Sequence, residues 1–239
     1  MEQVSEWISA SGKNVTEVAR LSGVARSTIH RIQTGQTVPT LSVLGSIAYA
    51  CGLSLILTTR ELFDVNAMHA ARAMLESGYV PPLECEKEVD KWIGRLSICG
   101  EGEAVGIVRA AGQASSPLNN PEALHLPYVF TATQLADAGL ATRAQWALSG
   151  TCGIAEIPTP ENILYTQHPE LAHTLLTQTA HRVSNKVGNT YIVPITNGVM
   201  FDSWADGNLR FVAPIQILLD CFGLGREAQQ LALEEAQTW

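Results

Sequence analysis

Residues 14–52 constrain the fold more than any other stretch of the 239-residue chain, because they read as three short helices joined by two tight turns. Asn14, followed three residues later by Glu17, has the pattern of a helix N-cap with its capping-box partner. Gly23 ends that first helix, since glycine adopts the left-handed conformation of such a turn without strain. A second helix is predicted over about 25–33. The segment therefore predicts two short helices that cross at a tight turn.

The predicted second helix has one apolar and one polar face. Ile29 and Ile32 point inward at helical spacing. Its outer face carries Arg26, Ser27, His30 and Arg31. Gly35 closes the helix, and residues 39–40 open a third one. The side chains with which this third helix is expected to complete the core are Leu41, Leu44, Ile47, Ala48 and Cys51.

Small and apolar residues recur in this segment at a spacing with a known counterpart. They are Val18, Ala19, Ser22, Gly23, Val24, Ser27, Thr28, Ile29, Gly35, Pro39, Leu44 and Ala48. The pattern resembles the helix-turn-helix of Cro and lambda-repressor type (XRE-like) proteins and covers about the first quarter of the chain. The resemblance implies double-stranded DNA as the partner, with the second helix in the major groove. A helical hairpin that serves only packing is the alternative.

The resemblance also implies which side chains contact DNA. Arg26, Ser27 and Arg31 lie where such proteins touch bases, and His30 lies beside them. Arginine donates two hydrogen bonds to O6 and N7 of guanine, so Arg26 and Arg31 are the candidates for base reading. Phosphate contacts set the register without reading sequence. The candidates for these contacts are Asn14, Thr28, Gln36 and Thr37.

Two positions depart from the family pattern. Val15 stands where a glutamine often makes a phosphate contact. Ala25 stands where Ser or Thr usually caps the recognition helix, and such a loss costs about 1 kcal/mol of helix stability. Both departures predict modest DNA affinity for this domain alone, to be made up by a second subunit or a second contact surface.

Charge is unevenly distributed along the chain, which carries a formal net charge of −8 at pH 7. Residues 1–60 hold five Lys and Arg side chains against three acidic ones, a net charge of +2, so residues 61–239 carry −10. This division is expected if the N-terminal part meets phosphate and most of the remaining surface does not.

Residues 53–59 alternate in polarity and are rich in strand formers, so they predict a short strand that leaves the helical domain. An edge strand at this place could pair with its copy in a second subunit, because unpaired backbone groups on an edge invite such pairing. Cro-like domains usually bind palindromes as dimers, with recognition helices about 34 Å apart. A monomer with a second DNA-contacting surface in its body is the alternative, and the sequence leaves both open.

The remaining chain predicts further helices and then strands. Val4, Trp7 and Ile8 form a helical stripe before the motif, and helices are predicted at 65–77, 84–96 and 100–112. The fold class is an N-terminal all-α helix-turn-helix domain of four to five helices followed by an α/β (α+β) C-terminal domain. The expected division is 1–60 for the helix-turn-helix domain, 61–125 for a helical connector region and 126–239 for the C-terminal domain.

Four stretches after residue 126 carry a second resemblance. They are WALSGTCGIAEI, ENILYTQHPE, KVGNTYIVPI and VMFDSWADGNLRFVAPIQILLDCFGLGREAQQLALEE. Together they resemble the C-terminal domain of AbiEi-type antitoxins of type IV toxin–antitoxin systems. The resemblance implies a toxin partner from the same operon, a nucleotidyltransferase. That family's usual DNA-binding domain is a winged helix of another type, so its DNA-site geometry does not carry over.

The residues themselves predict strands at 163–165, 190–195 and 209–212 in this region. The helices that follow are expected to bury Leu218, Leu219, Phe222, Leu231 and Leu233.

Candidate metal and catalytic groups are weaker than the DNA-binding pattern. Asp202 and Asp206 flank a tryptophan, but Asp206-Gly207 is typical of a turn. The six histidines show no ligand spacing, so no metal or cofactor is expected. Five cysteines without a Cys-x-x-Cys pair indicate reduced, mostly buried thiols of a cytosolic protein. Arg182 and Lys186 are candidates for a second, weak phosphate contact.

One enzyme interpretation is a self-cleaving Ser-Lys peptidase, a domain that repressors with a Cro-like domain often carry. The bond between Ala111 and Gly112 would be cleaved, with Ser149 as nucleophile and Lys186 as base. Ser149 lacks the Gly-Asp-Ser-Met setting of such enzymes. Lys186 lies beside a glycine turn rather than in an apolar strand that would lower its pKa. We therefore expect no enzymatic activity.

These observations predict a cytoplasmic, sequence-specific DNA-binding transcriptional repressor. It would act by occupying a promoter, and the first candidate is the promoter of its own gene. As an antitoxin, it would silence a toxin–antitoxin operon; a phage or mobile-element immunity repressor is the alternative. The polar, acidic N-terminus predicts no secretory signal, and no apolar run approaches the ~20 residues that span a bilayer, so no membrane partner is expected.

Overall fold

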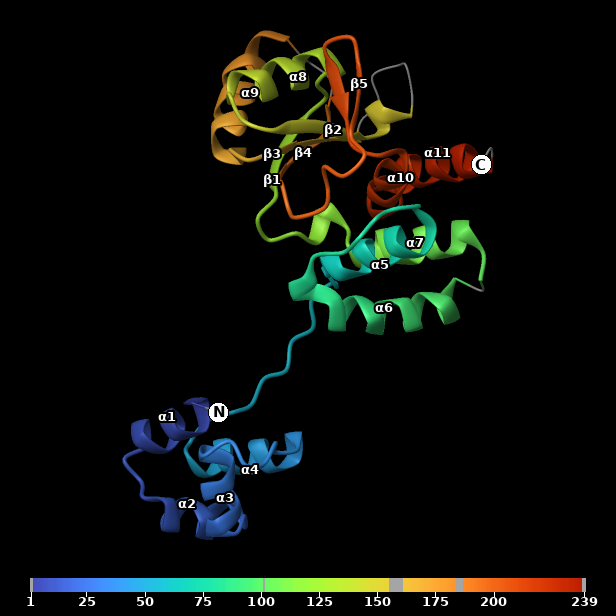
Figure 1. Ribbon diagram of the computed structural model, residues 1–239. Coiled ribbons are helices and arrows are strands. Elements are labelled where there is room, and N and C mark those ends of the chain that lie inside the picture. Colours follow the sequence, from blue (N-terminus) through green and yellow to red (C-terminus); the bar gives the residue numbers. More distant parts are fainter. Residues whose placement is uncertain (1, 101, 155–160, 184–186, 238–239) are drawn as a thin grey trace. The chain divides into compact units, whose positions relative to one another are not determined.

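The computed structural model describes residues 2–100, 102–154, 161–183 and 187–237. The chain divides into two compact units, Met1–Arg60 and Glu61–Trp239. The first unit is all helical, and the second combines helices with a mixed six-stranded sheet (Figure 1). The predicted fold class, an all-α helix-turn-helix domain followed by an α+β domain, is confirmed. We call the first unit the head and the second the body.

The head consists of four helices. They are α1 (Glu2–Ala10), α2 (Val15–Ser22), α3 (Arg26–Gln33) and α4 (Leu41–Ala50). Their shared core contains Val4, Ile8, Val18, Ile29, Ile32, Ile47, Ala50 and Cys51. The prediction that Ile29 and Ile32 point inward is therefore confirmed. The prediction for Leu41 is wrong: this side chain is 57% exposed, because it is the first residue of α4 and lies beyond the edge of the core.

Local sequence signals explain where α2 and α3 begin and end. Asn14 and Glu17 form the predicted capping box, each side chain accepting a hydrogen bond from the other residue's backbone N–H at 3.0 Å. Gly23 adopts φ +70°, and Gly35, directly after the α3 cap, adopts φ +79°. The N–H of Gln36 then donates to the carbonyl of Arg31 at 2.8 Å, which closes the end of α3 in the manner of a Schellman motif.

The predicted strand at 53–59 is not formed. Residues 53–64 follow α4 as an extended segment that belongs to no helix or strand. A strand exists only as part of a ladder, and no other strand of the described chain pairs with this segment. Favourable side chains alone therefore did not produce a strand here.

The body begins with helices α5 (Val65–Leu75), α6 (Glu86–Cys99) and α7 (Ala104–Ala114). Short 3₁₀ turns lie at Leu83–Cys85 (η1) and Pro117–Asn119 (η2). We predicted residues 61–125 as a connector region. In the structure, α5, α6 and α7 lie in the same compact unit as the sheet, and their buried side chains belong to the core that also contains the strands.

The sheet has six strands in the order β1-β4-β3-β2-β6-β5. Their bounds are β1 Leu124–Tyr128, β2 Trp146–Gly150, β3 Glu161–Thr166, β4 Val187–Pro194, β5 Trp204–Asp206 and β6 Leu209–Phe211. The predicted strands correspond to β3, β4 and β6. Strands β2 and β3 are antiparallel, β3 and β4 parallel, and β2 and β6 parallel. Residues 207–208 connect β5 to β6 as the predicted turn after Asp206.

Helices α8 (Ala132–Ala141), α9 (Pro169–Val183) and α10 (Pro214–Gly223) pack on this sheet, and α11 (Arg226–Ala236) packs on α10 (Figure 1). A further 3₁₀ turn, η3, lies at Thr151–Gly153. Helices α8 and α9 pack against the strands, and α10 packs on β2 and α7. Every residue of β2 is buried as a result.

Two further predictions about the body need correction. Leu218, Leu219 and Phe222 are buried as expected, whereas Leu231 and Leu233 are only half-buried, because α11 turns its alanines inward. The cysteines are not mostly buried. Cys51 and Cys221 are buried, Cys85 and Cys152 are half-buried, and Cys99 is exposed; all five are free thiols. No helix of the described residues is long and apolar enough to cross a lipid bilayer.

Candidate nucleic-acid interface

Helix α3 presents a polar surface to solvent. Arg26, Ser27, His30 and Arg31 are all exposed, whereas Ile29 and Ile32 on the opposite side are fully buried. The structure thus brings the four predicted base-reading residues onto one face of one helix. Buried Ile29 and Ile32 hold the helix to the head and fix which face points outward.

The two arginines of this face are not paired. Among the described residues, neither Arg26 nor Arg31 forms an ion pair. Within the described residues, these two side chains make one long hydrogen bond, from Nε of Arg31 to the carbonyl of Ser27 at 3.4 Å. Helix α3 contains no acidic residue. Two exposed guanidinium groups without a carboxylate partner are suited to bind an external acceptor such as guanine or phosphate.

The predicted phosphate-contacting residues lie around α3. Asn14 caps α2 through its side-chain oxygen, which leaves its NH₂ group available. Gln36 is exposed and Thr37 half-buried in the turn that follows α3. Thr28 is half-buried on α3 itself. These positions are compatible with phosphate contacts, and the contacts themselves remain a prediction.

The start of α3 has no side-chain cap. Ala25 occupies the N-cap position and makes no side-chain hydrogen bond, as its sequence position indicated. Its carbonyl accepts from the N–H groups of Thr28 and Ile29, so the N–H groups of Arg26 and Ser27 have no partner from a cap. The first turn of the recognition helix is therefore held less firmly than that of α2.

Arg20 is an exposed cation of the helix-turn-helix that was not among the predicted contacts. Arg20 lies exposed in the last turn of α2, the helix that crosses α3. It contributes to the net charge of +2 in residues 1–60. That charge was the sequence signal that could have marked Arg20 as a further candidate for a DNA contact.

Comparison with known proteins agrees with this geometry in the head. Residues 9–61 match a family model described as a helix-turn-helix domain, which supports an XRE-like helix-turn-helix. No curated protein and no solved structure matches the chain. The matched domain and its exposed polar helix indicate a DNA-binding regulator. The likeness of residues 126–239 to AbiEi-type antitoxins receives no support from these comparisons and stays a prediction.

Three of the residues in the alternative peptidase interpretation, Ala111, Gly112 and Ser149, are buried in the body. Ala111 and Gly112 are buried within α7, where a cleavage site would be inaccessible. A β-carbon on Gly112 would lie 2.3 Å from the carbonyl oxygen of Leu219, so α7 and α10 cross in direct contact here. Ser149 is fully buried, and its hydroxyl donates to Asp220. Lys186 lies outside the described residues.

Other candidate groups in the body form no metal site within the described residues. No cluster of three or more His, Cys, Asp or Glu side chains suited to a metal ion is found there, and Asp202 and Asp206 belong to none. The side chain of Arg182, like Lys186, lies outside the described part of the chain, so the weak second phosphate contact stays a prediction.

A buried polar network centred on Arg72 was not anticipated from the sequence. Arg72 is fully buried on α5 and forms a two-pronged ion pair with Glu76, at 2.6 and 3.0 Å. Its other N–H groups donate to the carbonyls of Gly198 and Phe201, both at 3.0 Å. The guanidinium therefore ties α5 to the loop between β4 and β5. The available signal was an arginine on the apolar side of a helix.

Asp220 forms the second part of this network. It lies buried on α10 and accepts hydrogen bonds from Tyr165 at 3.0 Å, Gln216 at 2.9 Å and Ser149 at 2.5 Å. Burial raises the pKa of Asp220 to about 6, although these three donors act in the opposite direction. The network joins β2, β3 and α10. Because these groups satisfy one another, their role is structural.

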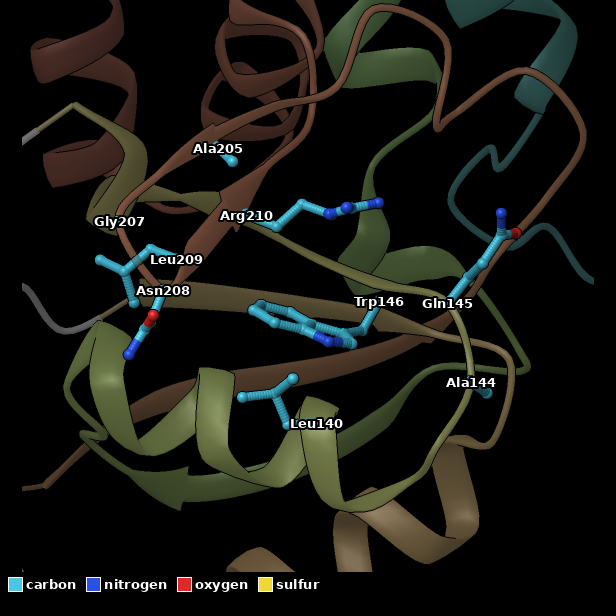
Figure 2. A pocket seen from close by; sticks show the side chains of 9 residues that line it. All are labelled: Leu140, Ala144, Gln145, Trp146, Ala205, Gly207, Asn208, Leu209 and Arg210. Carbon is cyan, nitrogen blue, oxygen red and sulfur yellow. The ribbon is translucent and has the colours of Figure 1, made fainter.

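A cavity of about 410 Å³ lies where α8 meets the hairpin of β5 and β6. Figure 2 shows the ring of Trp146 in this cavity between the side chains of Leu140 and Arg210, with Asn208 at the hairpin turn. Its lining residues are Leu140, Ala144, Gln145, Trp146, Ala205, Gly207, Asn208, Leu209 and Arg210. This lining contains no carboxylate, imidazole, thiol or hydroxyl group for acid–base or nucleophilic chemistry. This cavity therefore offers no group for such chemistry, whereas the exposed face of α3 carries two arginines without an ion-pair partner in the described chain.

Proposed function

We propose that this protein is a cytoplasmic, sequence-specific transcriptional repressor that binds an operator in its own promoter through α3. The observation that supports it best is the pair of exposed, unpaired arginines, Arg26 and Arg31, on the outer face of the matched helix-turn-helix. The mechanism is occupancy: a protein bound in the major groove at a promoter excludes RNA polymerase. No catalytic step is required, and we propose none.

The charge of the two units supports this assignment. The head, with a net charge of +2, is attracted to phosphate, whereas the body, with −10, is repelled from it. DNA binding is therefore concentrated in the head. We further propose that the regulated operon is a toxin–antitoxin operon whose toxin, a nucleotidyltransferase, is the partner of the acidic body. This second part rests on the resemblance of residues 126–239 alone.

The experiment is a binding titration of the full chain against overlapping fragments of its own upstream DNA, followed by footprinting on the fragment that binds. The proposal expects one tightly bound fragment with a protected stretch over the promoter. A reporter gene behind that promoter should be silenced by the protein and released by Arg31→Ala. Equal, weak binding to every fragment would contradict the repressor assignment.

The neighbouring genes separate the two kinds of repressor. The antitoxin role is supported if an adjacent gene encodes a nucleotidyltransferase. That enzyme should inhibit growth when it is expressed alone, and the repressor should relieve the inhibition. Adjacent integrase or phage structural genes favour an immunity repressor. The footprint itself is expected in either case, so the two parts of the proposal fail independently.

A further inference from the structure

A second cavity of the body lies among its helices and has a volume of about 630 Å³. It shares no lining residue with the cavity in Figure 2. Its walls come from the end of α5, the start of α7, the start of α10 and the end of α11, with Asp202 from the loop between β4 and β5. All of these elements belong to the body. A cavity of this size accommodates a small organic ligand.

The inner wall of this cavity is aliphatic. Val108, Ile215 and Leu218 line it and are buried in the core of the body. Leu75 and Val105 extend this apolar wall toward solvent. None of the lining residues in the described chain is aromatic. The wall therefore favours an apolar group through burial, and it offers no aromatic cage of the kind that recognises quaternary ammonium ions.

The charged groups that line the cavity are all carboxylates. They are Glu76, Glu103 and Asp202, and the lining includes no lysine, arginine or histidine among the residues that the structure describes. Glu76 is held in an ion pair by buried Arg72. Glu103 and Asp202 are exposed, and their side chains have neither a hydrogen bond nor an ion pair within the described chain. Two carboxylates without a cation thus line one apolar cavity.

The helix ends at the cavity do not reverse this negative charge. Helices α7 and α10 begin there, at Ala104 and Pro214. Helices α5 and α11 end there, at Leu75 and Ala236. The partial positive charges of two helix N-termini and the partial negative charges of two C-termini oppose one another. The unit charges of the unpaired carboxylates therefore decide which ligand is attracted, and they favour a cation.

The walls of the cavity are fixed by contacts that are already satisfied. Arg72 bonds Glu76 with two N–H groups and also donates to the carbonyl of Phe201, the residue before Asp202, at 3.0 Å. These bonds join the end of α5 to the loop that carries Asp202. Helices α7 and α10 are in direct contact at Gly112. A ligand that enters walls fixed in this way has less ordering of the protein to offset.

We propose that this cavity binds a small organic cation, a primary ammonium group carried on an apolar body. The ammonium group donates charge-assisted hydrogen bonds to the carboxylates of Glu103 and Asp202. The apolar body lies against Val108, Ile215 and Leu218, where it is removed from water. The same carboxylates repel an anion. This ligand site goes beyond the proposed function, because it lies in the body and requires no DNA.

The test is isothermal titration calorimetry of the full chain with three probes that share one apolar body: phenylbutylammonium, phenylbutanol and phenylbutanoate. The ammonium should bind at one saturable site, the alcohol with roughly tenfold lower affinity, and the carboxylate should not bind. Glu103→Gln combined with Asp202→Asn should reduce the affinity for the ammonium to that for the alcohol. Glu122→Gln combined with Glu170→Gln is the matched control, since it removes two exposed carboxylates outside the cavity and should leave binding unchanged.

A further variant tests the location without removing a charge. Ala104 is exposed on the lining, so the indole of Ala104→Trp should occupy the cavity and abolish binding of the ammonium. Thermal unfolding without probe checks that each variant is folded. The proposal is overturned if wild type shows no saturable binding of phenylbutylammonium or binds phenylbutanol equally well. Equal loss in the control pair, or unchanged binding in Ala104→Trp, overturns it as well. Because no DNA is present, these outcomes are independent of whether the protein is a repressor.

Discussion

The head and the body use arginine in opposite ways. In the head, Arg26 and Arg31 are exposed on α3 and have no carboxylate partner within the described chain. In the body, Arg72 is fully buried, and its N–H groups donate hydrogen bonds to Glu76 and to two backbone carbonyls. The difference teaches where to look for function: a satisfied buried charge holds elements together, whereas an exposed unpaired charge is available to a ligand.

The largest expected effect is a loss of stability when the buried arginine of the body is replaced. Arg72→Met should destabilise the body by roughly 3–5 kcal/mol, because it removes a fully buried guanidinium and leaves Glu76, whose side chain is only 12% exposed, without its ion-pair partner. Urea unfolding followed by tryptophan fluorescence measures this loss. Arg226→Met, at an exposed position on α11, is the matched control and should stay near wild type. Equal stability of the two variants would show that the buried network contributes little.

A smaller effect concerns the pH dependence of stability. The folded pKa of Asp220 is raised to about 6, so the folded body binds its proton more tightly than the unfolded chain. Stability from this group is therefore present below the unfolded pKa and falls as pH rises through about 6. The difference in unfolding free energy between wild type and Asp220→Asn should change by about 3 kcal/mol between pH 3 and pH 7.

His69 provides a contrast within the same pH range. Burial, with Arg72 nearby, lowers the pKa of His69 to about 4, so its contribution to stability rises with pH over this window. It is present in both proteins, and the subtraction removes it. Parallel stability curves for wild type and Asp220→Asn would contradict the burial of an ionisable carboxyl at this position.

The smallest expected effect concerns the missing N-cap of α3, the helix that carries the exposed arginines of the head. Ala25→Ser should stabilise the start of α3 by about 1 kcal/mol, because a serine hydroxyl can accept from an open N–H group of the first turn. Hydrogen exchange of the first amides of α3 measures this gain. Thr16→Ser, at an exposed position inside α2, is a control that creates no cap. Unchanged protection would show that the first turn is already firmly held.

The head could be predicted more completely than the body because its signals are local. A capping box spans four residues, and a glycine marks each turn. In the body, β1 was missed because it contains a proline, which argues against a strand, and β2 because burial on both faces removes the alternation. The buried network depends on partners such as Arg72 and Gly198, which are far apart in the sequence. No local sequence pattern predicts such contacts.

The segment at 53–59 shows the opposite error. Its alternation favours a strand, yet a strand also needs a neighbour, and none is present in the described chain. The predicted base-reading residues were found on one exposed face because helical periodicity alone determines that placement. Which of them contact DNA is a property of the complex, and a sequence pattern implies it only by resemblance.

The most direct test of the central claim compares exposed arginines of the two units on DNA. Wild type, Arg26→Ala, Arg31→Ala and Arg226→Ala are titrated against the footprinted fragment and a scrambled one, at two salt concentrations. We predict that the two α3 variants each lose about 1–3 kcal/mol of discrimination between the fragments, whereas Arg226→Ala does not. If all four proteins discriminate equally, α3 does not read sequence and the account of the head is wrong.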